Sequence, residues 1–294
     1  MRRFLLIPHL KIHNANAMSS PYSIGFPAIT AWLGGVHVLQ RKLHENGFKE
    51  VQLLGTAISC HDLNLQTYKG RVDYISSIIG TANPLDKDGD RPAFIEEARC
   101  HLEVSLLIEY QGLDPDNLKK FQEFIDQQLR KMKFAGGDVL SVKPVDIIIA
   151  DEDDESSIKK ALRKLMLGYV IIERRDLVKK SMQEEGKDAL DGVLDHLKIM
   201  NRSSENEKGE VSWNSSKKEA GWLVPIATGF QGISDLGSAK NQRDQNTPHR
   251  FAESVVTLGE FVMPRRIKKL DDMLWQYHVD QDLYLCQTNS NLTK

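Results

Sequence analysis

Six apolar segments follow one another between residues 4 and 150, and their order restricts the fold more than any other feature of the sequence. Runs of continuous or alternating apolar residues predict strands, whereas apolar residues at every third or fourth position predict helices. The resulting order is strand, helix, strand, strand, helix, strand, which is that of the ferredoxin-like fold also used by RNA-recognition modules. We therefore predict an α+β protein in which residues 1–150 form an RNA-recognition-like (ferredoxin-like) core, with helical and loop insertions.

Four of these segments have the composition of strands. The first is followed by a polar stretch, residues 13–23, which should separate it from the first helix. In the third, every second residue from Leu102 to Ile108 is apolar, so these side chains should share one face. The predicted strands are Phe4–Ile12, Val51–Ile58, His101–Tyr110 and the apolar run Val145–Ala150.

The other two segments are marked as helices by their apolar spacing. Gly34 and Gly35 each lower the stability of the first helix by about 1 kcal/mol relative to alanine, which implies that another backbone approaches there. Asp114 and Pro115 predict the start of the second helix, as N-cap and first-turn proline, and Gly136-Gly137 should end it. The apolar stripes are Trp32, Val36, Leu39 and Leu43 in the first helix and Leu118, Phe121, Ile125 and Leu129 in the second.

Residues 151–220 are expected to form a helical insertion followed by a mobile polar loop. Ser156 or Ser157 can cap a helix after an acidic stretch, and the apolar spacing from Leu190 to Leu197 predicts a second helix. Residues 201–220 are polar and lack periodicity, so they predict the loop.

Residues 221–294 are expected to add C-terminal strands and a glycine-rich loop that pack on the core. The predicted strands are Trp222–Thr228, Ser254–Phe261 and Asp282–Cys286. The residues between the last two predict a helix over Lys268–Tyr277.

The charged residues are unevenly distributed, although the net charge is only −2. Residues 1–49 contain six Lys/Arg and one acidic residue (+5), and residues 240–269 contain seven and three (+4). Residues 84–126 have the opposite balance, with eleven acidic and five basic residues (−6). A single basic segment is usually a solvated face. Two of them, if brought together by the fold, favour a polyanion such as RNA as the partner.

The N-terminus and the cysteines both predict a cytoplasmic protein. The apolar run after Arg3 ends at Pro8 after four residues, which is too short for a signal peptide. The sequence lacks an apolar stretch of the roughly 20 residues that a membrane-spanning helix needs, so a membrane is not an expected partner. Three widely spaced cysteines without a Cys-x-x-Cys motif indicate neither a disulfide framework nor a zinc knuckle.

Motifs that carry catalytic or metal chemistry are missing from the sequence. It contains no Walker A loop, no His-Glu-x-x-His pair and no Gly-x-Ser-x-Gly elbow. The acidic residues between 86 and 97 imitate a calcium loop, but Arg91 stands where the sharp turn requires glycine. Cys60-His61 and Cys100-His101 should lie on strands, where adjacent side chains point to opposite faces and cannot readily chelate one ion. We therefore expect no metal, no cofactor and no enzymatic activity.

Two segments contain residue types suited to binding RNA. The first, residues 14–21, places short amides and hydroxyls just after the first predicted strand. A loop of such residues offers backbone N–H groups and amides to phosphates or base edges without bulky obstruction. The alternative is a turn built from residues that commonly cap helices. The candidate RNA ligands in this segment are Asn14, Asn16 and Ser20.

The second segment is rich in glycine and arginine. Paired glycines let the main chain approach a nucleic-acid backbone, a phenylalanine can stack on a base, and arginines neutralise phosphates. The alternative is an ordinary surface loop. The candidate RNA ligands here are Gly229, Phe230, Gln231, Gly232, Arg243 and Arg250.

Motifs spread over nearly the whole chain carry a family resemblance. In the first part they are His13–Ala17, Ser19-Ser20-Pro21, Gly25–Ala28, His37–Arg41, Asn83-Pro84-Leu85, Lys87-Asp88-Gly89 and Glu97–Leu106. In the last part they are Gly229-Phe230-Gln231, Arg243-Asp244, Arg250–Ser254, Gly259-Glu260 and Met273-Leu274-Trp275. With these motifs the chain resembles the Csy-two family, the Cas-five-like subunit of the type I-F CRISPR surveillance complex.

The resemblance implies a non-catalytic subunit that caps one end of the complex together with a large subunit and holds the 5′ handle of the guide RNA. The implied partners are the guide RNA, the large subunit and a neighbouring backbone subunit, while contact with the target DNA stays open. In such a complex the target sequence is recognised by the guide's own base pairing.

Two other functions remain open from the sequence. A metal-independent endoribonuclease that matures guide RNA would use His13 or His249 as general base, with a nearby cation on the developing charge. A scaffold that binds only protein would leave the basic segments as solvated surface. RNA cleavage that depends on either histidine would support the first, and salt-sensitive RNA binding would exclude the second.

Overall fold

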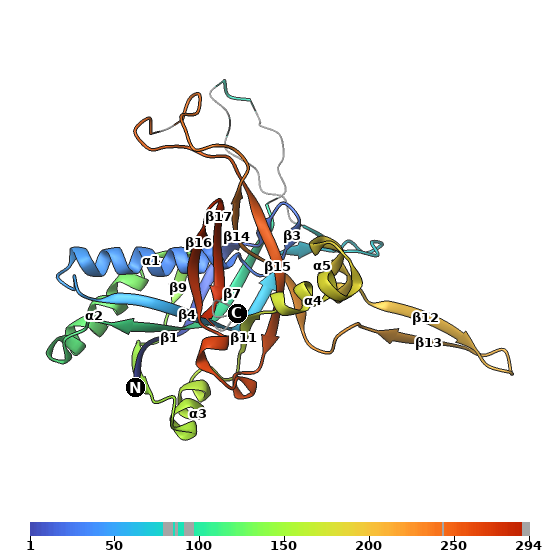
Figure 1. The fold of residues 1–294 in the computed structure, drawn as a ribbon, viewed down its shortest axis with the longest axis horizontal. Coiled ribbons are helices and arrows are strands. Elements are labelled where there is room, and N and C mark those ends of the chain that lie inside the picture. Colours follow the sequence, from blue (N-terminus) through green and yellow to red (C-terminus); the bar gives the residue numbers. More distant parts are fainter. Residues whose placement is uncertain (79–84, 86–87, 91–96, 243, 290–294) are drawn as a thin grey trace.

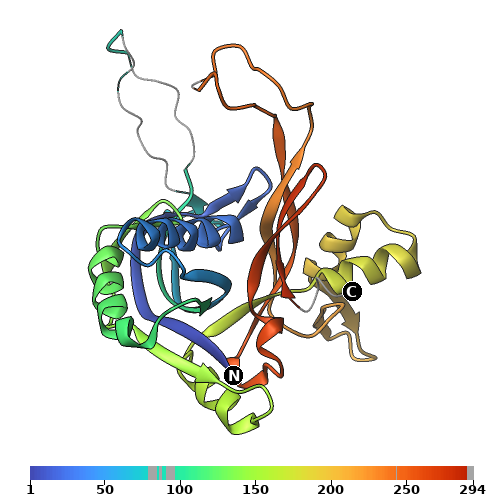
Figure 2. The same ribbon diagram turned by 60° about the vertical axis from the view of Figure 1, so that its left-hand side comes forward.

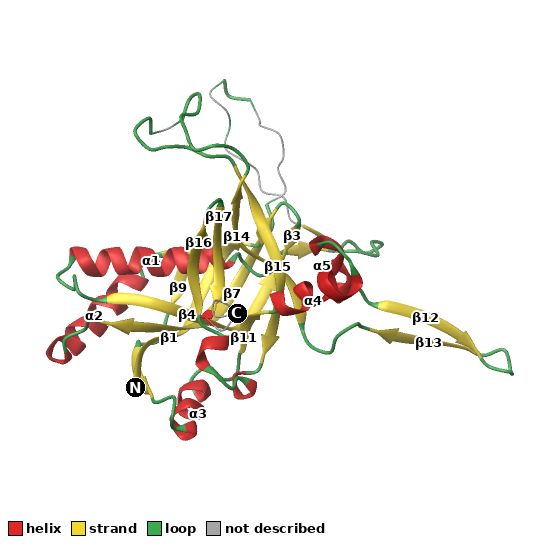
Figure 3. Cartoon of the chain, viewed as in Figure 1, coloured by secondary structure: helices red, strands yellow, loops and turns green. Residues whose placement is uncertain are grey.

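The structure is a computed structural model that describes residues 1–294 except 79–84, 86–87, 91–96, 243 and 290–294. Helices surround a large antiparallel sheet of eleven described strands, which confirms the predicted α+β class (Figures 1 and 3). Among the described residues, no helix is both long and apolar enough to span a membrane.

The helices and strands are given in the order in which they occur along the chain. The first half contains β1 (Arg2–Asn16), β2 (Met18–Ser20), β3 (Ser23–Ile24), α1 (Ile29–Glu45), β4 (Gln52–Leu65), β5 (Thr67–Tyr68), β6 (Ser77–Ile78), β7 (Arg99–Gln111), α2 (Leu118–Leu129), β8 (Lys133–Phe134), β9 (Gly137–Ser141) and β10 (Asp146–Ala150). The second half contains α3 (Glu155–Arg163), β11 (Tyr169–Glu173), α4 (Arg175–Glu185), α5 (Ala189–Leu197), β12 (Met200–Glu205), β13 (Val211–Ser216), β14 (Leu223–Gly232), β15 (Ala252–Val262), β16 (Trp275–Asp280) and β17 (Leu283–Thr288). Short 3-10 turns are Pro115–Asn117, Pro264–Arg266 and Leu270–Asp272.

Four strands of the first half form the centre of the sheet. β1 pairs with β10 and β7, and β7 pairs with β4, so the spatial order is β10–β1–β7–β4. Every neighbouring pair is antiparallel, and β9 pairs with the part of β1 that extends beyond β10. α1 and α2 contribute to the same core cluster and cover one face of these strands (Figure 2).

α1 buries its predicted apolar face in this main core. Trp32 and Leu39 are fully buried, in one cluster with the apolar stripe of α2. Burying a side chain of this size contributes about 1.5–3 kcal/mol to the stability of the fold. The close approach predicted at the glycine pair occurs only at Gly35, where a Cβ would lie 2.5 Å from Cδ1 of Phe134. An aromatic ring therefore approaches this helix, not another backbone, and nothing lies within 4 Å of a Cβ on Gly34.

The opposite face of the central strands carries a second core. Phe4 and Leu6 of β1 and Leu107 of β7 pack there with Leu162 of α3 and Ile267. α3 and the segment around the two C-terminal 3-10 turns thus cover the part of this face near the N-terminus (Figure 1).

The strands of the second half close into a ring with β4. Their order is β16–β17–β14–β15–β11, all antiparallel, and both β16 and β11 pair with β4. At the two joints, Trp275 lies opposite Thr56 and Val170 lies opposite Ser59. Trp275 is buried, and its Nε1–H donates to the carbonyl of Ile171 at 2.9 Å. The predicted C-terminal strands therefore exist and extend the central sheet.

α4 and α5 lead into a hairpin that extends away from the body (Figures 1 and 3). The prediction of a polar loop over residues 201–220 is wrong, because β12 and β13 form an antiparallel pair there. The pairing runs from Met200 opposite Ser216 to Glu205 opposite Val211. Both strands are exposed along their whole length. An exposed ribbon buries neither face, so the sequence had no apolar period from which the strands could be predicted.

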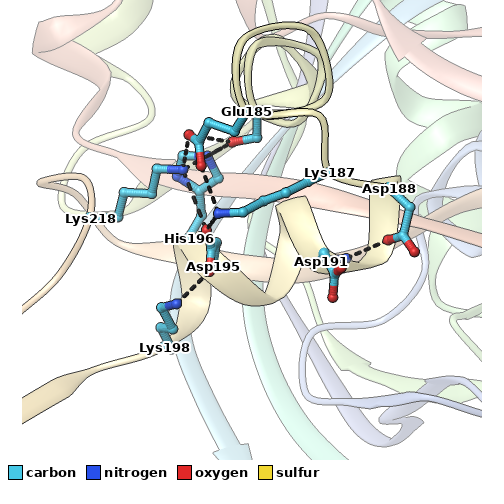
Figure 4. A network of polar contacts seen from close by, with 9 residues as sticks. Glu185, Lys187, Asp188, Asp191, Asp195, His196, Lys198 and Lys218 are labelled. Atoms are coloured by element: carbon cyan, nitrogen blue, oxygen red, sulfur yellow. Dashed lines mark hydrogen bonds and ion pairs between the residues drawn. The ribbon is translucent and has the colours of Figure 1, made fainter.

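An ion-pair network joins the base of this hairpin to both helices (Figure 4). Lys187 pairs with Glu185 of α4 at 2.6 Å and also with Asp195 of α5. Lys218, which follows β13, pairs with Glu185 as well. Hydrogen bonds from these two lysines hold the pKa of Glu185 at about 2, well below its usual range.

Two predicted boundaries in the first half are corrected. β1 does not end at Ile12, because Ala15 is buried and the strand continues alongside β7 to Asn16. Gly136 and Gly137 do not end α2, which stops at Leu129. Gly136, with φ +76°, belongs to the tight turn between β8 and β9.

Two predictions in the second half are also corrected. Asp154, not Ser156 or Ser157, caps α3, since its carboxylate accepts the backbone N–H of Ser156 at 2.9 Å. The helix predicted over Lys268–Tyr277 consists of a 3-10 turn followed by β16. Pairing with β17 along the whole of β16 outweighs the local helical spacing there.

Candidate nucleic-acid interface

Asn14 lies on an irregular part of β1, not in a loop. The register with β7 shifts between Ile12 and Ala15, and Asn14 has φ +59°, a left-handed conformation that asparagine tolerates better than most residues. Its backbone N–H donates to Nδ1 of His101 at 3.1 Å. The residue is exposed, so its side-chain amide can reach a ligand.

Asn16 and Ser20 are engaged within their own segment. The Asn16 amide accepts the N–H of Met18 and donates to the Met18 carbonyl, each at 3.1 Å. Ser20 is 4% exposed, and its Oγ accepts the N–H of Tyr22 at 3.1 Å and bonds Oγ of Ser23 at 2.8 Å. For these two residues the geometry favours the turn alternative.

The glycine-rich segment is the end of strand β14, which corrects the predicted loop. Gly229 pairs with Val255 of β15 and with Leu285 of β17. A Cβ on Gly229 would lie 2.1 Å from the carbonyl oxygen of Tyr284. Glycine is needed here because two strands of the protein itself approach closely.

Gly232 and Arg250 lie together where the β14–β15 connection begins and ends. A Cβ on Gly232 would lie 2.5 Å from Cδ of Arg250. The Arg250 guanidinium pairs with Asp282 at 2.6 Å, while its buried Nε has no acceptor among the described residues. Because this Nε is enclosed, only the partly exposed end of the Arg250 guanidinium can reach a ligand. Arg243 lies outside the described residues.

The fold brings the neighbourhoods of the two segments together. The hairpin formed by β2 and β3, which follows Asn16, contacts β14. The described parts of the connection between β14 and β15, residues 233–242 and 244–251, project beyond the strands in both ribbon views (Figures 1 and 2).

Three exposed aromatic side chains line one face of β14, β17 and β16. Phe230 and Tyr284 are direct cross-strand partners, whose side chains project to the same face. The ring of Tyr277 lies 5.2 Å from that of Tyr284, measured between centroids. Phe230, Tyr284 and Tyr277 are 43%, 38% and 37% exposed, and we call them the aromatic row.

The aromatic row ends beside a small hollow between β16 and α1. The hollow has a volume of about 200 Å³, and its polar lining includes His37, Gln40 and Gln276. Burial raises the pKa of the Tyr277 phenol above its usual range. Exposed rings can stack on an unpaired base, and neighbouring amides and an imidazole can form hydrogen bonds with the edge of that base.

Comparison with known proteins places the chain in a family. Residues 5–286 match the family described as CRISPR-associated protein (Cas_Csy2). A protein of Pseudomonas aeruginosa (strain UCBPP-PA14), "CRISPR-associated protein Csy2", is 33% identical, and the match covers 95% of this chain and 92% of that protein. The chain belongs to the Csy2 family. The resemblance that the sequence motifs indicate is thereby confirmed over nearly the whole chain.

Two members of the aromatic row in this Csy2-family chain were not among the residues predicted from the sequence. Tyr277 was assigned to a helix, and Tyr284 was placed on a strand without a role. A local signal was present, since Trp275, Tyr277 and Val279 alternate with polar residues as in a half-buried strand.

A second polar surface of the Csy2-family chain lies on the central strands. β1 is irregular at His9, which has φ +52°. We use the name histidine face for the surface formed by His9, His13, His61, His101 and Glu103. His9 stacks on His61 with ring centroids 4.5 Å apart and bonds Glu103 at 2.6 Å, while His13 stacks on His101 at 4.3 Å. The bond with His9 lowers the pKa of Glu103, and burial lowers that of His61.

The two histidines of the ribonuclease alternative lie on different elements. His13 belongs to β1 and the histidine face, whereas His249 lies in the β14–β15 connection with its ring edge-on to Phe251 at 5.0 Å. Within the described residues, no three His, Cys, Asp or Glu side chains are grouped so that they could hold a metal ion.

Proposed function

We propose that the chain is a non-catalytic subunit of a type I-F CRISPR surveillance complex and binds the 5′ handle of the guide RNA. The aromatic row carries this proposal, because three exposed rings lie in line next to Gly232 and Arg250. Exposed aromatic side chains on a sheet are a common means of holding unstacked RNA bases. Membership of the Csy2 family supplies the CRISPR context.

We further propose that residues 1–150 form an RNA-recognition-like, ferredoxin-like core. The spatial order β10–β1–β7–β4, with α1 and α2 on one face, supports this assignment, because two interlocked split β-α-β units produce that order. Residues 151–220 are then an insertion, and residues 221–294 are C-terminal strands packed on the core.

In the proposed complex, handle bases stack on the aromatic row while the backbone of the RNA follows the β14–β15 connection. Base–aromatic stacking contributes about 1–3 kcal/mol per base. Arg243 and Arg250 neutralise phosphates, which adds affinity without sequence information. Gln231 and Asn14 offer exposed amides to base edges.

The proposed protein partners are a large subunit and a neighbouring backbone subunit, in the cytoplasm. Exposed apolar side chains on the outlying elements support a protein-covered surface, among them Leu190 and Leu194 of α5 and Trp213 of β13. A two-stranded ribbon such as β12–β13 is marginally stable alone, so contact with a partner would stabilise it.

Fluorescence anisotropy with a handle RNA, using the chain co-expressed with its large subunit, tests the RNA proposal. Phe230→Ala and Tyr284→Ala should each weaken binding by about 5- to 150-fold, since each removes a stacking ring. Tyr68→Ala is the matched control, because Tyr68 is an exposed aromatic residue on β5, outside the row. Parental affinity in both row variants would place the RNA elsewhere on the chain.

Incubation with a guide-repeat transcript tests the non-catalytic part of the proposal. The expected result is that the transcript stays intact. Neither candidate histidine lies in a recognised motif that supplies both a general base and a second group to orient it. Discrete products that disappear with His13→Ala or His249→Ala would support the ribonuclease alternative instead.

A further inference from the structure

A groove with a volume of about 820 Å³ lies between α3 and residues 265–268. We call it the basic groove. In both ribbon views α3 lies at the opposite end of the molecule from the β14–β15 connection (Figures 1 and 2). The groove is therefore separate from the candidate nucleic-acid interface.

The floor of the basic groove is apolar. It is formed by Ile158, Leu162 and Met166 on one side and Ile267 on the other. Leu162 and Ile267 are members of the second core, so the floor continues that core to the surface. All four side chains are aliphatic or, in Met166, a flexible thioether. The described lining includes no aromatic ring on which a base could stack.

The rim of the basic groove is strongly cationic. Its cationic residues are Lys159 and Arg163 on α3 and Arg265, Arg266 and Lys268 on the facing wall. Glu155 is the only acidic residue in the described lining, and it pairs with Lys159 at 2.7 Å. The three arginines form no ion pair with any described residue.

The simplest explanation for lysines and arginines on α3 is a solvated helix face. The lysines of α3 that lie outside the groove can be compared with the cations that line it. Lys160 and Lys164 lie outside the groove, and Lys164 pairs with Asp146 at 3.0 Å. The groove cations instead come from two elements far apart in the sequence and converge around an apolar floor. Like charges gathered in this way repel one another unless an anionic group lies between them.

We infer that the basic groove binds an acidic amphipathic segment of a protein partner. An apolar side chain of that segment covers the floor, and flanking carboxylates pair with the rim arginines, whose planar guanidinium groups match carboxylates in bidentate geometry. A single-stranded nucleic acid fits less well, because its bases would find no stacking ring. The volume lies within the usual range of ligand clefts. This inference does not rest on RNA binding by the aromatic row.

Anisotropy titration of the full chain with a labelled synthetic peptide tests the inference. The probe is an amphipathic helix with leucines on one face and glutamates beside them, and it should bind saturably. The double variant Arg163→Glu/Arg266→Glu should weaken binding by about tenfold or more, because two attractions become repulsions. Lys160→Glu makes the same charge reversal on α3 outside the groove and should change affinity by less than about twofold.

Two further measurements separate the possible occupants. A peptide with lysine in place of glutamate should bind the double variant better than the parent chain, and a mixed-sequence RNA should not displace the acidic peptide. The inference is overturned if the acidic peptide does not bind the parent, if Lys160→Glu matches the double variant, or if the RNA competes. Thermal melts confirm that the variants are folded, and handle-RNA binding should be unchanged in them, so that failure here is distinct from failure of the RNA proposal.

Discussion

The two segments that sequence analysis selected for RNA binding differ in what their side chains already contact. In the first, Asn16 and Ser20 are bonded to the residues that follow them. In the second, the rings of the aromatic row are exposed, and the side chain of Arg250, although paired with Asp282, is partly exposed. Amides and hydroxyls that are close in sequence readily satisfy one another. Groups that are brought together by pairing of distant strands have no such local partners and stay open to a ligand.

The largest expected effect concerns the strand pairing that creates the second region. Gly229→Val should lower the free energy of unfolding by about 2–3 kcal/mol, because its Cβ would collide with the Tyr284 carbonyl. The urea midpoint measures this change. Gly237→Ala is the control, since nothing lies within 4 Å of a Cβ there, and it should change stability by less than about 0.5 kcal/mol. Equal midpoints for the two variants would show that the close approach has no energetic importance.

The next effect distinguishes the two amides of the first region. Asn14→Ala should cost roughly 1–3 kcal/mol of binding on the correct handle and little on a scrambled one, if the exposed amide pairs with a base edge. Asn16→Ala should leave discrimination unchanged and lower the free energy of unfolding by about 1 kcal/mol, because it removes the two bonds to Met18. Binding isotherms and urea melts on both variants separate these roles. Unchanged discrimination in Asn14→Ala would remove the first region from the interface.

A smaller effect is expected at the arginine of the second region. Arg250→Ala should weaken binding to correct and scrambled handles about equally and lower the slope of log K against log salt by roughly 0.7, the value for one lost phosphate contact on a single strand. Titrations at several salt concentrations measure the slope. Arg130→Ala, at the exposed end of α2, is the charge-matched control. Loss of discrimination at constant slope would mean that Arg250 contacts a base.

The smallest effect is a dependence of stability on pH that originates in the histidine face. His61 has a lowered pKa, so the unfolded chain binds its proton more readily and stability falls as the pH drops below about 6.5. Glu103 also has a lowered pKa in the folded protein. Its contribution to the free energy of unfolding is therefore fully present above the pKa of the unfolded chain, and it is lost as the pH falls through the pKa of the folded protein. Urea midpoints between pH 7 and pH 4 should therefore decrease. His61→Gln should flatten the upper part of this curve, and a curve identical to that of the parent would contradict the assignment.

Sequence patterns predicted the elements that bury one clear face. The periodicity around Trp32 and Phe121 predicted α1 and α2, and alternation along β7 predicted a central strand. Elements whose environment is supplied by distant residues were missed. Trp275 is buried by the ring of strands and bonded to Ile171, so β16 replaces a helix that local spacing favoured. β12 and β13 are exposed on both faces and carry no period at all.

The candidate site shows the same limit. Phe230 and Arg250 were selected for their residue types, and both lie where a ligand can approach. Tyr277 and Tyr284 join them only through the pairing of β16, β17 and β14, which no local pattern specifies. Gly229 was selected for freedom to approach RNA, whereas its conformational role is to accommodate β17. Residue type indicated the neighbourhood, and long-range pairing decides which atoms remain available.

β4 has a thermodynamic consequence through its position between the two groups of strands. It pairs with β7 along one edge and with β16 and β11 along the other. Unfolding of either group would leave β4 with a bare edge, which is a template for aggregation. The two halves of the chain should therefore unfold in one cooperative transition, and amide hydrogens of β4 should exchange with solvent much more slowly than those of the exposed β12–β13 ribbon. A fragment that ends before β11 would retain this bare edge and should aggregate rather than fold as an independent unit.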